Sequence, residues 1–158
     1  MQRKIIGRAY AMNRAVGRNK DFYKKIAHYY NISETTQFLL YLIYTEEKSY
    51  TQLELSHRAR LPVQTVNSAI SKLEKKGIIT LEKVSGQGRS KLVKLTSDGE
   101  IFVQEKVMPL LNSEIRAIER LSEKEYEQLI YLLNKYITYL FEEFENIVKQ
   151  ESEMETEK

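Results

Sequence analysis

The chain has 158 residues, of which 42% are hydrophobic and 30% charged, as in an ordinary globular domain. No run approaches the roughly 18 to 20 apolar residues that a membrane-spanning helix needs. Charges interrupt the basic N-terminal segment before an apolar signal-peptide core can form. The lack of cysteine excludes disulfides, thiolate zinc sites and thiol-based redox sensing. We therefore expect an intracellular, cytoplasmic protein.

The net charge of +3 is divided unevenly along the chain. Residues 1–95 carry 18 Lys and Arg against 7 Asp and Glu, a net charge of +11. Residues 96–158 carry 7 against 15, a net charge of −8. The basic N-terminal part is typical of a protein that contacts a polyanion. Charge alone leaves open the alternative of two solvated surfaces of opposite sign.

The first 45 residues have helical periodicity. Apolar residues recur at spacings of three and four over residues 1–30, beginning with the stripe Ile5, Ala9, Met12 and Val16. Ser33 is a good N-cap for a second helix. Residues 38–43 are apolar almost all round that helix, which predicts a central buried position.

Two short helices joined by a tight turn are predicted next. Thr51 and Glu54 have the spacing of a capping box at the start of the first helix. Pro62 is expected near the first position of the second helix, and Gly77 is expected to end it. A short capped helix, a turn and a second helix form a helix-turn-helix.

The second of these helices, residues 62–76, has two distinct faces on a helical wheel. One is apolar and is expected to be buried: Val66, Ala69, Ile70 and Leu73. The other has no acidic residue before Glu74 and consists of short polar side chains, amides and a lysine: Gln64, Asn67, Ser68, Ser71 and Lys75. Such side chains suit a helix that reads base edges in the major groove. A merely polar exposed helix is the alternative.

A β-hairpin is predicted around the segment "SGQGRS", which lies between "IITLEKV" and "KLVKL". Gly86 and Gly88 allow the chain to reverse, and they leave no side chain to keep the hairpin tip away from a DNA backbone. Their spacing fits neither a dinucleotide-binding fingerprint nor a P-loop. Arg89 is expected in a minor groove, with Lys83, Lys91 and Lys94 facing phosphates. A plain turn without a ligand is the alternative.

The C-terminal third is predicted to be helical. Ser97 and Glu100 have capping-box spacing, with Thr96 or Ser97 as the cap, and Pro109 is expected to interrupt this helix near residues 107–108.

The last helix is expected to run from Ser122, which forms a capping-box pair with Glu125, to about Lys149. Its apolar stripe is wider than packing against one neighbour requires. The acidic tail, residues 151–158, is expected to be disordered.

Residues 51–99 resemble the MarR family of bacterial winged-helix regulators. The matching pieces are "TQ.EL", "TV...I..LEKKGII", "RSKLV.LT" and "LTSDG". The resemblance implies a homodimer with its interface on the first and last helices, a recognition helix at 62–76 and a wing arginine at Arg89. It also implies a repressor that is released by a small aromatic or lipophilic compound. Two residues depart from the family pattern: Gln87 replaces an acidic wing residue, and Arg60 replaces a small residue in the turn.

The expected fold is mostly α with a small β-hairpin wing. We expect a single MarR-like domain over residues 1–150, with a winged helix-turn-helix at 33–97 between dimerisation helices at 1–32 and 98–150. The apolar stripes of the first and last helices exceed what a small winged helix can cover, which supports the dimer independently. A two-fold dimer places its recognition helices about one DNA turn apart and predicts a pseudo-palindromic operator in double-stranded DNA.

The candidate sites follow from these assignments. The residues expected to contact DNA are Thr51, Gln52, Arg60, Pro62, Val63, Gln64, Thr65, Asn67, Ser68, Ser71, Lys72, Lys75, Lys83, Gly86, Gln87, Gly88, Arg89, Ser90 and Lys91. Five tyrosines fall near the junction where MarR-family members bind effectors and form the candidate effector pocket: Tyr23, Tyr29, Tyr30, Tyr41 and Tyr44. Core or dimer contacts are the alternative for these tyrosines.

An enzymatic function is not expected. His28 and His57 lie on different predicted helices without a carboxylate at metal-ligand spacing, and no serine, histidine and acid arrangement indicates a nucleophilic triad. We expect no metal and no cofactor. Three hypotheses remain: a ligand-responsive dimeric regulator, a DNA-binding or architectural factor without an effector, and a winged-helix module that binds protein.

Overall fold

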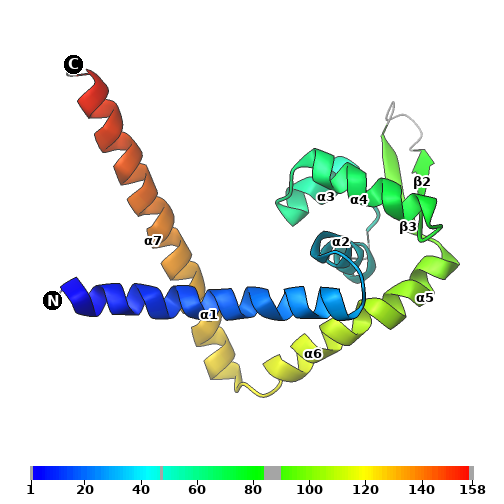
Figure 1. Ribbon diagram of the computed structural model, residues 1–158, viewed down its shortest axis with the longest axis horizontal. Helices are drawn as coiled ribbons and strands as arrows, with labels where there is room; N and C mark the ends of the chain where they lie inside the picture. Colours follow the sequence, from blue (N-terminus) through cyan, green and yellow to red (C-terminus); the bar gives the residue numbers. More distant parts are fainter. Residues whose placement is uncertain (1, 47, 84–89, 157–158) are drawn as a thin grey trace. The chain divides into compact units, whose positions relative to one another are not determined.

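A computed structural model describes residues 2–46, 48–83 and 90–156, and these form seven helices and three short strands (Figure 1). In chain order they are α1 (Gln2–Tyr29), α2 (Glu34–Thr45), β1 (Tyr50–Thr51), α3 (Gln52–Ala59), α4 (Val63–Lys75), β2 (Ile79–Lys83), β3 (Lys91–Leu95), α5 (Ser97–Lys106), α6 (Met108–Ile118) and α7 (Glu123–Thr156). The expected class, mostly α with a β wing, is confirmed.

Hydroxyl side chains cap the starts of α2, α3, α5 and α7, because the first backbone N–H groups of a helix have no partner within it. Ser33 accepts the N–H of Thr36 at 3.1 Å. The capping box at Thr51 is formed as predicted, and so is the one that Ser122 makes with Glu125. The box expected at Ser97 is wrong: Thr96 is the cap of α5 and its hydroxyl accepts the N–H of Gly99.

Three helices end in the same hydrogen-bonded turn, in which one residue takes the left-handed conformation. These residues are Asn31 (φ 53°) after α1, Arg60 (φ 52°) after α3 and Gly77 (φ 69°) after α4. After α4, the N–H of Ile78 donates to the carbonyl of Leu73. Gly77 therefore ends this helix as the sequence predicted.

Helix α2 lies at the centre of the N-terminal part, in contact with α1, α3, α4, α5 and β3 (Figure 1). Its predicted buried position is confirmed for Leu39 and Leu40, which have no exposed surface. The core around them draws apolar side chains from α3, α4, β3 and α5, among them Leu55, Val66, Ile70, Val93 and Val103. Burial of such side chains is the main favourable term in folding, at about 25 cal/mol per Å² of apolar surface.

The sheet has three antiparallel strands in the order β1-β3-β2, instead of the two strands that the sequence predicted. Strand β3 pairs with β2 from Ile79↔Leu95 to Lys83↔Lys91. On its other side β3 pairs with β1, where Tyr50 faces Val93. The wing is therefore joined through β1 to the start of α3.

The chain divides into two compact units, residues 1–112 and 113–158, and the boundary falls within α6. Helix α5 stops before Val107 and α6 follows it, as expected from Pro109. Helix α7 extends to Thr156, beyond the predicted end near Lys149. Residues 151–156 are therefore helical, and the expected disorder of this segment is wrong for them. No helix among the described residues is both long and apolar enough to cross a bilayer.

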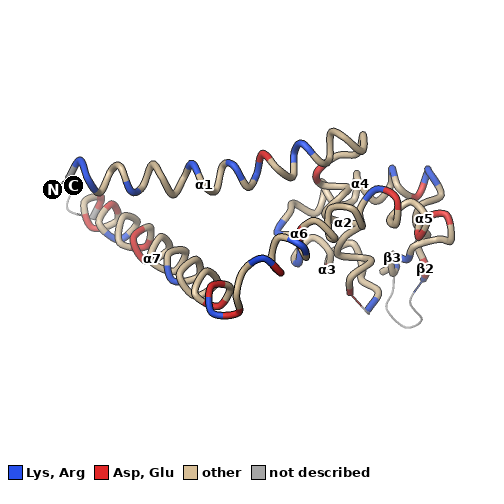
Figure 2. Tube along the Cα trace, turned by 90° about the horizontal axis from the view of Figure 1, so that it is seen from below, with Lys and Arg blue, Asp and Glu red and all other residues tan. Residues whose placement is uncertain are grey.

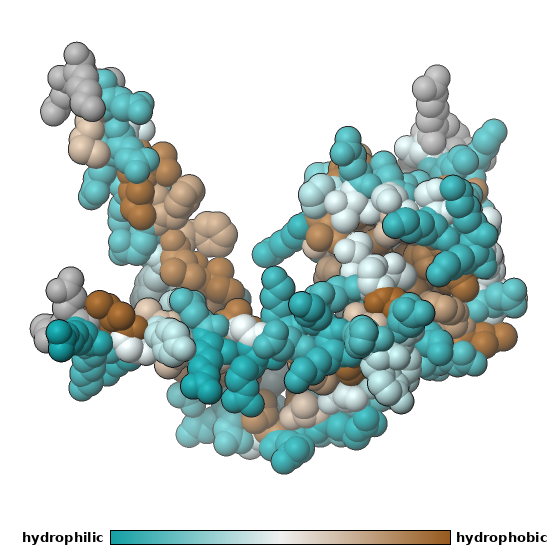
Figure 3. Space-filling view, in the orientation of Figure 1, coloured by the Kyte–Doolittle hydropathy of each residue, from teal (hydrophilic) through white to brown (hydrophobic). Residues whose placement is uncertain are grey.

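Large apolar side chains are exposed along α1 and α7. On α7 they include Leu129, Ile137, Leu140, Phe144 and Ile147, and Figure 3 shows apolar residues (brown) along this helix. On α1, Ile5 and Val16 are both more than half exposed. Apolar stripes of this length are typical of surfaces that interact with other molecules.

Candidate nucleic-acid interface

Helices α3 and α4 form a helix-turn-helix. They pack against each other and are joined by residues 60–62. The predicted inner face of α4 is confirmed, because Val66 and Ile70 have no exposed surface and Ala69 and Leu73 are buried. These four side chains fix which face of α4 points away from the core.

The outer face of α4 is exposed over its whole length. It presents nine of the residues predicted to contact DNA, counting Pro62 at its cap: Pro62, Val63, Gln64, Thr65, Asn67, Ser68, Ser71, Lys72 and Lys75. Glutamine and asparagine amides can bond base edges, while lysines are suited to phosphates. The chemistry and the exposure of this face both fit a helix that lies in a DNA groove.

The N-terminal end of α4 has no acidic residue in its first turn, and its N-cap Pro62 makes no side-chain capping bond. The positive end of the helix dipole is therefore not compensated there, which favours an anion nearby. A shallow hollow of about 410 Å³ lies between this helix and the start of α2. Hydroxyl, amide and ammonium groups line it, including Ser33, Thr36, Gln64, Ser68 and Lys72.

The arms of the wing carry three further predicted residues, Lys83, Ser90 and Lys91, all of them exposed. Lys83 and Lys91 face each other across the β2–β3 pair. Gly86, Gln87, Gly88 and Arg89 at the wing tip lie outside the described residues. Lys94, also expected to face phosphates, forms an ion pair with Glu82 at 2.6 Å.

The remaining predicted residues lie at the two ends of α3. Thr51 and Gln52 are half-buried at its start. The Thr51 hydroxyl accepts the N–H of Glu54 and donates to the Glu54 carboxylate, so it serves as a helix cap. The Glu54 carboxylate also accepts the backbone N–H of Thr51 at 2.8 Å. This bond first, and then the bond from the hydroxyl, lower the pKa of Glu54. Arg60, at the other end, is exposed in the turn.

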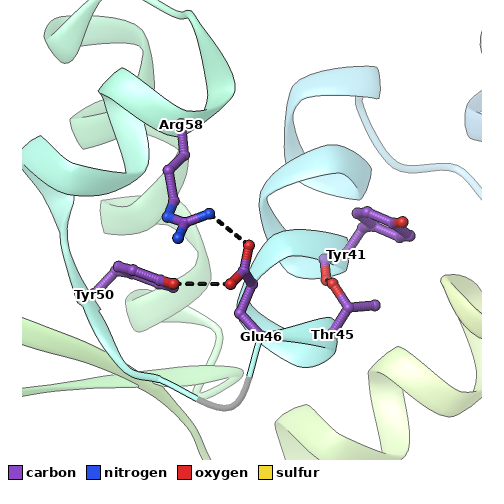
Figure 4. Close-up of polar contacts among 5 residues, drawn as sticks. All are labelled: Tyr41, Thr45, Glu46, Tyr50 and Arg58. Atoms are coloured by element: carbon purple, nitrogen blue, oxygen red, sulfur yellow. Dashed lines mark hydrogen bonds and ion pairs between the residues drawn. The ribbon is translucent and has the colours of Figure 1, made fainter.

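Sequence reasoning missed a polar cluster that joins α2 to the helix-turn-helix (Figure 4). Glu46, the C-cap of α2, accepts a hydrogen bond from the Tyr50 hydroxyl at 2.8 Å and pairs with Arg58 at 2.6 Å. The Arg58 guanidinium also lies 4.5 Å from the centre of the Tyr50 ring. Burial raises the pKa of Tyr50, and the bond to Glu46 raises it further. No sequence motif marks a contact between residues 12 apart in different elements.

The five candidate effector tyrosines are divided between α1 and α2 and the turn that follows α1. Tyr44 hydrogen-bonds Gln104 of α5 at 2.6 Å and lines a hollow of about 260 Å³ with Tyr50, Lys48 and Glu100.

The other four tyrosines make ring contacts. Tyr30 packs edge-on against Tyr29, which is 80% exposed. Tyr41 stacks on Phe38, and Tyr23 packs edge-on against Phe22. These contacts are compatible with either a pocket or a packing role.

Positive charge extends beyond the helix-turn-helix. Lys and Arg recur along α1, while α7 carries many Asp and Glu residues (Figure 2). Within the part of the chain that the structure describes, no group of three or more His, Asp or Glu side chains is placed to hold a metal ion.

Comparison with known proteins agrees with this geometry. A family model described as winged helix-turn-helix DNA-binding matches residues 34–80, from the start of α2 into β2. Comparison with curated protein sequences gives no match. Solved structures, in contrast, share the fold over most of the chain.

Three of these structures illustrate the similarity. The S. aureus MepR–DNA complex is 22% identical, with a TM-score of 0.66 over 83% of this chain and 96% of MepR. NMB1585, a MarR family regulator from Neisseria meningitidis, is 19% identical, with a TM-score of 0.69 over 85% of this chain and 93% of its own. NadR in complex with 4-hydroxyphenylacetate is 22% identical, with a TM-score of 0.65 over 80% of this chain and 89% of NadR. The chain therefore has the winged helix-turn-helix fold of the MarR-family regulators that its sequence resembles.

Proposed function

We propose that this protein is a MarR-type transcriptional regulator, which binds double-stranded DNA sequence-specifically as a homodimer and represses transcription until a small ligand releases it. The observation that carries the proposal is the outer face of α4. It is exposed along its length, free of acidic residues before Glu74, and rich in groups that pair with bases. The MepR–DNA complex, which has the same fold, supports this reading.

In the proposed complex α4 enters the major groove, where Gln64 and Asn67 bond adenine edges and Ser68 and Ser71 add shorter contacts. Lys72 and Lys75 neutralise phosphates beside the groove. The wing lies along the adjacent backbone, where Lys83 and Lys91 contact phosphates and Arg89 enters the minor groove. Thr51, Gln52 and Arg60 lie at the two ends of α3, near the same backbone.

Dimerisation uses the apolar faces of α1 and α7. Side chains such as Ile137 and Leu140 are about half exposed in the single chain. Their burial against a second copy removes apolar surface from water and so stabilises the dimer. Two copies related by a two-fold axis then read two half-sites about one helical turn apart. The operator is accordingly a pseudo-palindrome.

The proposed regulator is released from DNA by a small ligand. Tyr23, Tyr29, Tyr30, Tyr41 and Tyr44 offer aromatic surface and hydroxyl groups to a small aromatic or lipophilic molecule. The NadR complex with 4-hydroxyphenylacetate supports this class of ligand. A ligand that binds the DNA-free conformation more tightly shifts the population away from DNA. The protein acts in the cytoplasm and uses no cofactor.

Selection of random duplex DNA by the purified protein at physiological salt tests the proposal. Enrichment of a pseudo-palindromic sequence is the expected result. Recovery without a shared motif, with binding that collapses as salt rises, would instead indicate contact with the DNA backbone only and an architectural role. A failure to retain any DNA would favour a protein-binding module and exclude regulation through direct DNA contact.

A further inference from the structure

We propose that Glu46 is a positioning residue for DNA recognition: its carboxylate holds both ends of α3 against the end of α2 and so sets the orientation of α4. This inference rests on the proposed function, and it assigns a role to a residue that does not itself touch DNA.

The two carboxylate oxygens of Glu46 have separate partners (Figure 4). Oε2 accepts the hydroxyl of Tyr50, which immediately precedes Thr51, the N-cap of α3. Oε1 accepts from Nη1 of Arg58 in the last turn of α3. A single side chain at the C-cap of α2 is therefore bonded to the residue before α3 and to the residue that nearly ends it.

The contact between Arg58 and Tyr50 closes this arrangement into a triangle. The guanidinium lies over the ring at 4.5 Å, so each of the three side chains touches the other two. Because the partners lie at opposite ends of α3, the triangle opposes a tilt of that helix against the end of α2. Pairing of Tyr50 with Val93 extends the restraint to the central wing strand β3.

The orientation of α3 is passed on to α4. Only residues 60–62 separate the two helices, and they pack directly against each other. Base readout depends on hydrogen bonds with narrow distance and angle limits. A small rotation of α3 therefore costs the contacts of Gln64 and Asn67, whereas phosphate contacts by flexible lysines tolerate it.

The ion pair between Glu46 and Arg58 contributes little to folding itself. The Arg58 and Glu46 side chains are 45% and 31% exposed, and exposed ion pairs have small effects on stability. The fold is secured by fully buried residues such as Leu39, Leu55 and Ile70. Removal of the Glu46 side chain is accordingly expected to lower sequence-specific DNA binding while changing the stability of the fold little.

Arg58 is assigned the same positioning role. One of its amino groups bonds Glu46 and one face of its guanidinium lies over the Tyr50 ring, so its charge is already paired within the protein. Arg60, two residues further on, is exposed. The two arginines are therefore expected to behave differently when they are replaced.

The test compares Glu46→Ala with Glu82→Ala. Glu82 is a matched control because it forms an ion pair of the same length, 2.6 Å, with Lys94 on the wing, and its removal changes the net charge equally. Binding to the selected operator and to a random duplex is measured by fluorescence anisotropy, with the melting temperature taken alongside. We expect Glu46→Ala to lose roughly tenfold in affinity for the operator relative to Glu82→Ala.

The control readouts separate positioning from a merely structural role. Random-duplex affinity of the two variants should agree within about twofold, and melting temperatures should shift by no more than about 4 °C. Equal operator affinity in the two variants would overturn the inference. So would a loss of operator and random-duplex binding in the same proportion with a large fall in melting temperature.

A second variant, Arg58→Ala, is expected to reproduce the loss of Glu46→Ala without changing the dependence of binding on salt. A salt slope reduced by about one would mean that Arg58 contacts a phosphate, and the positioning role would be wrong. A wild-type protein that selects no DNA sequence would overturn the proposed function, and the inference with it. If only the inference is wrong, the wild-type protein still selects its operator, and Glu46→Ala binds that operator as tightly as Glu82→Ala does.

Discussion

Gly99 approaches the carbonyl oxygen of Ile78 so closely that a β-carbon on Gly99 would lie 1.9 Å from that oxygen. This contact docks the start of α5 on the turn that follows the recognition helix. Thr96 strengthens the junction, because its hydroxyl donates to the carbonyl of Gly77 and its N–H donates to that of Ile78. The glycine of the "LTSDG" segment is therefore a requirement of backbone packing.

Replacing Gly99 with alanine should destabilise the protein. The added methyl group overlaps a backbone atom that cannot rotate away, so we expect a loss of about 1–3 kcal/mol or more in the free energy of unfolding. Chemical denaturation followed by circular dichroism measures it. Gly7→Ala is the control: nothing lies within 4 Å of a β-carbon there, and alanine should stabilise helix α1 slightly. Similar losses in both variants would contradict the docking role of Gly99.

Arg60→Gly should raise stability while weakening DNA binding. Arg60 has a φ of 52°, a conformation that costs a non-glycine residue energy, so glycine should stabilise the fold by roughly 0.5–1 kcal/mol. The loss of its charge should weaken binding about equally on all DNA sequences and reduce the salt slope by about one. Denaturation and salt-dependent anisotropy measure the two effects.

Asn31→Gly serves as the control for Arg60→Gly, because Asn31 also ends a helix at a φ of 53°. Its stabilisation should be smaller, since asparagine adopts this conformation more readily. Its DNA binding should equal that of the wild type. An Arg60→Gly protein with unchanged affinity and salt slope would remove Arg60 from the interface.

Gln64→Ala should lower the sequence preference of DNA binding, whereas Lys72→Ala should lower affinity for every DNA sequence. Both side chains are exposed on the outer face of α4. If Gln64 reads a base, its removal should cost about 1–3 kcal/mol on the selected operator and relax the preference at one position. Lys72→Ala should weaken binding to every duplex alike, because a phosphate carries no sequence information. Repeating the selection with each variant distinguishes these outcomes; a uniform loss for Gln64→Ala would end its base-reading assignment.

Acid should weaken the start of α3. The backbone N–H and then the hydroxyl of Thr51 lower the pKa of Glu54 below its ordinary value of 4.5. A carboxylate with a lowered pKa stabilises the fold above its unfolded-state pKa, and this stabilisation is lost as the pH falls through the folded-state value. Stability should therefore decline below about pH 4.5, and less steeply in Glu54→Gln. Denaturation across this range tests it, with the exposed Glu74→Gln as control; equal slopes would contradict the prediction.

Local rules of the sequence predicted most of the fold. Helical spacing found the buried face of α4, from Val66 to Leu73, because amphipathic periodicity follows directly from burial. Capping-box spacing found the starts of α3 and α7. At α5 the sequence left the cap open between Thr96 and Ser97, and the box spacing paired Ser97 with Glu100, whereas Thr96 is the cap. Adjacent hydroxyl residues differ only in the backbone geometry that the fold imposes.

Contacts between distant segments were not predictable. Strand β1 is only Tyr50 and Thr51, and its pairing with β3 has no local signal. The ion pair of Glu46 with Arg58 depends on how α2 meets α3, which the core decides. The helical continuation of α7 past residue 150 contradicts a reading based on composition alone, because a polar acidic segment can extend a helix that has already nucleated.

A single charge on the apolar face of α7 should prevent dimerisation. Ile137 is 41% exposed in the single chain, and in the proposed dimer it is buried against the second copy. Ile137→Glu would then place an unpaired carboxylate in an apolar interface, at a cost of several kcal/mol. Analytical ultracentrifugation should show a dimer for the wild type and a monomer for the variant. Gln128→Glu adds the same charge on the opposite face of α7 and should remain dimeric; monomers in both variants, or in neither, would show that this face does not form the interface.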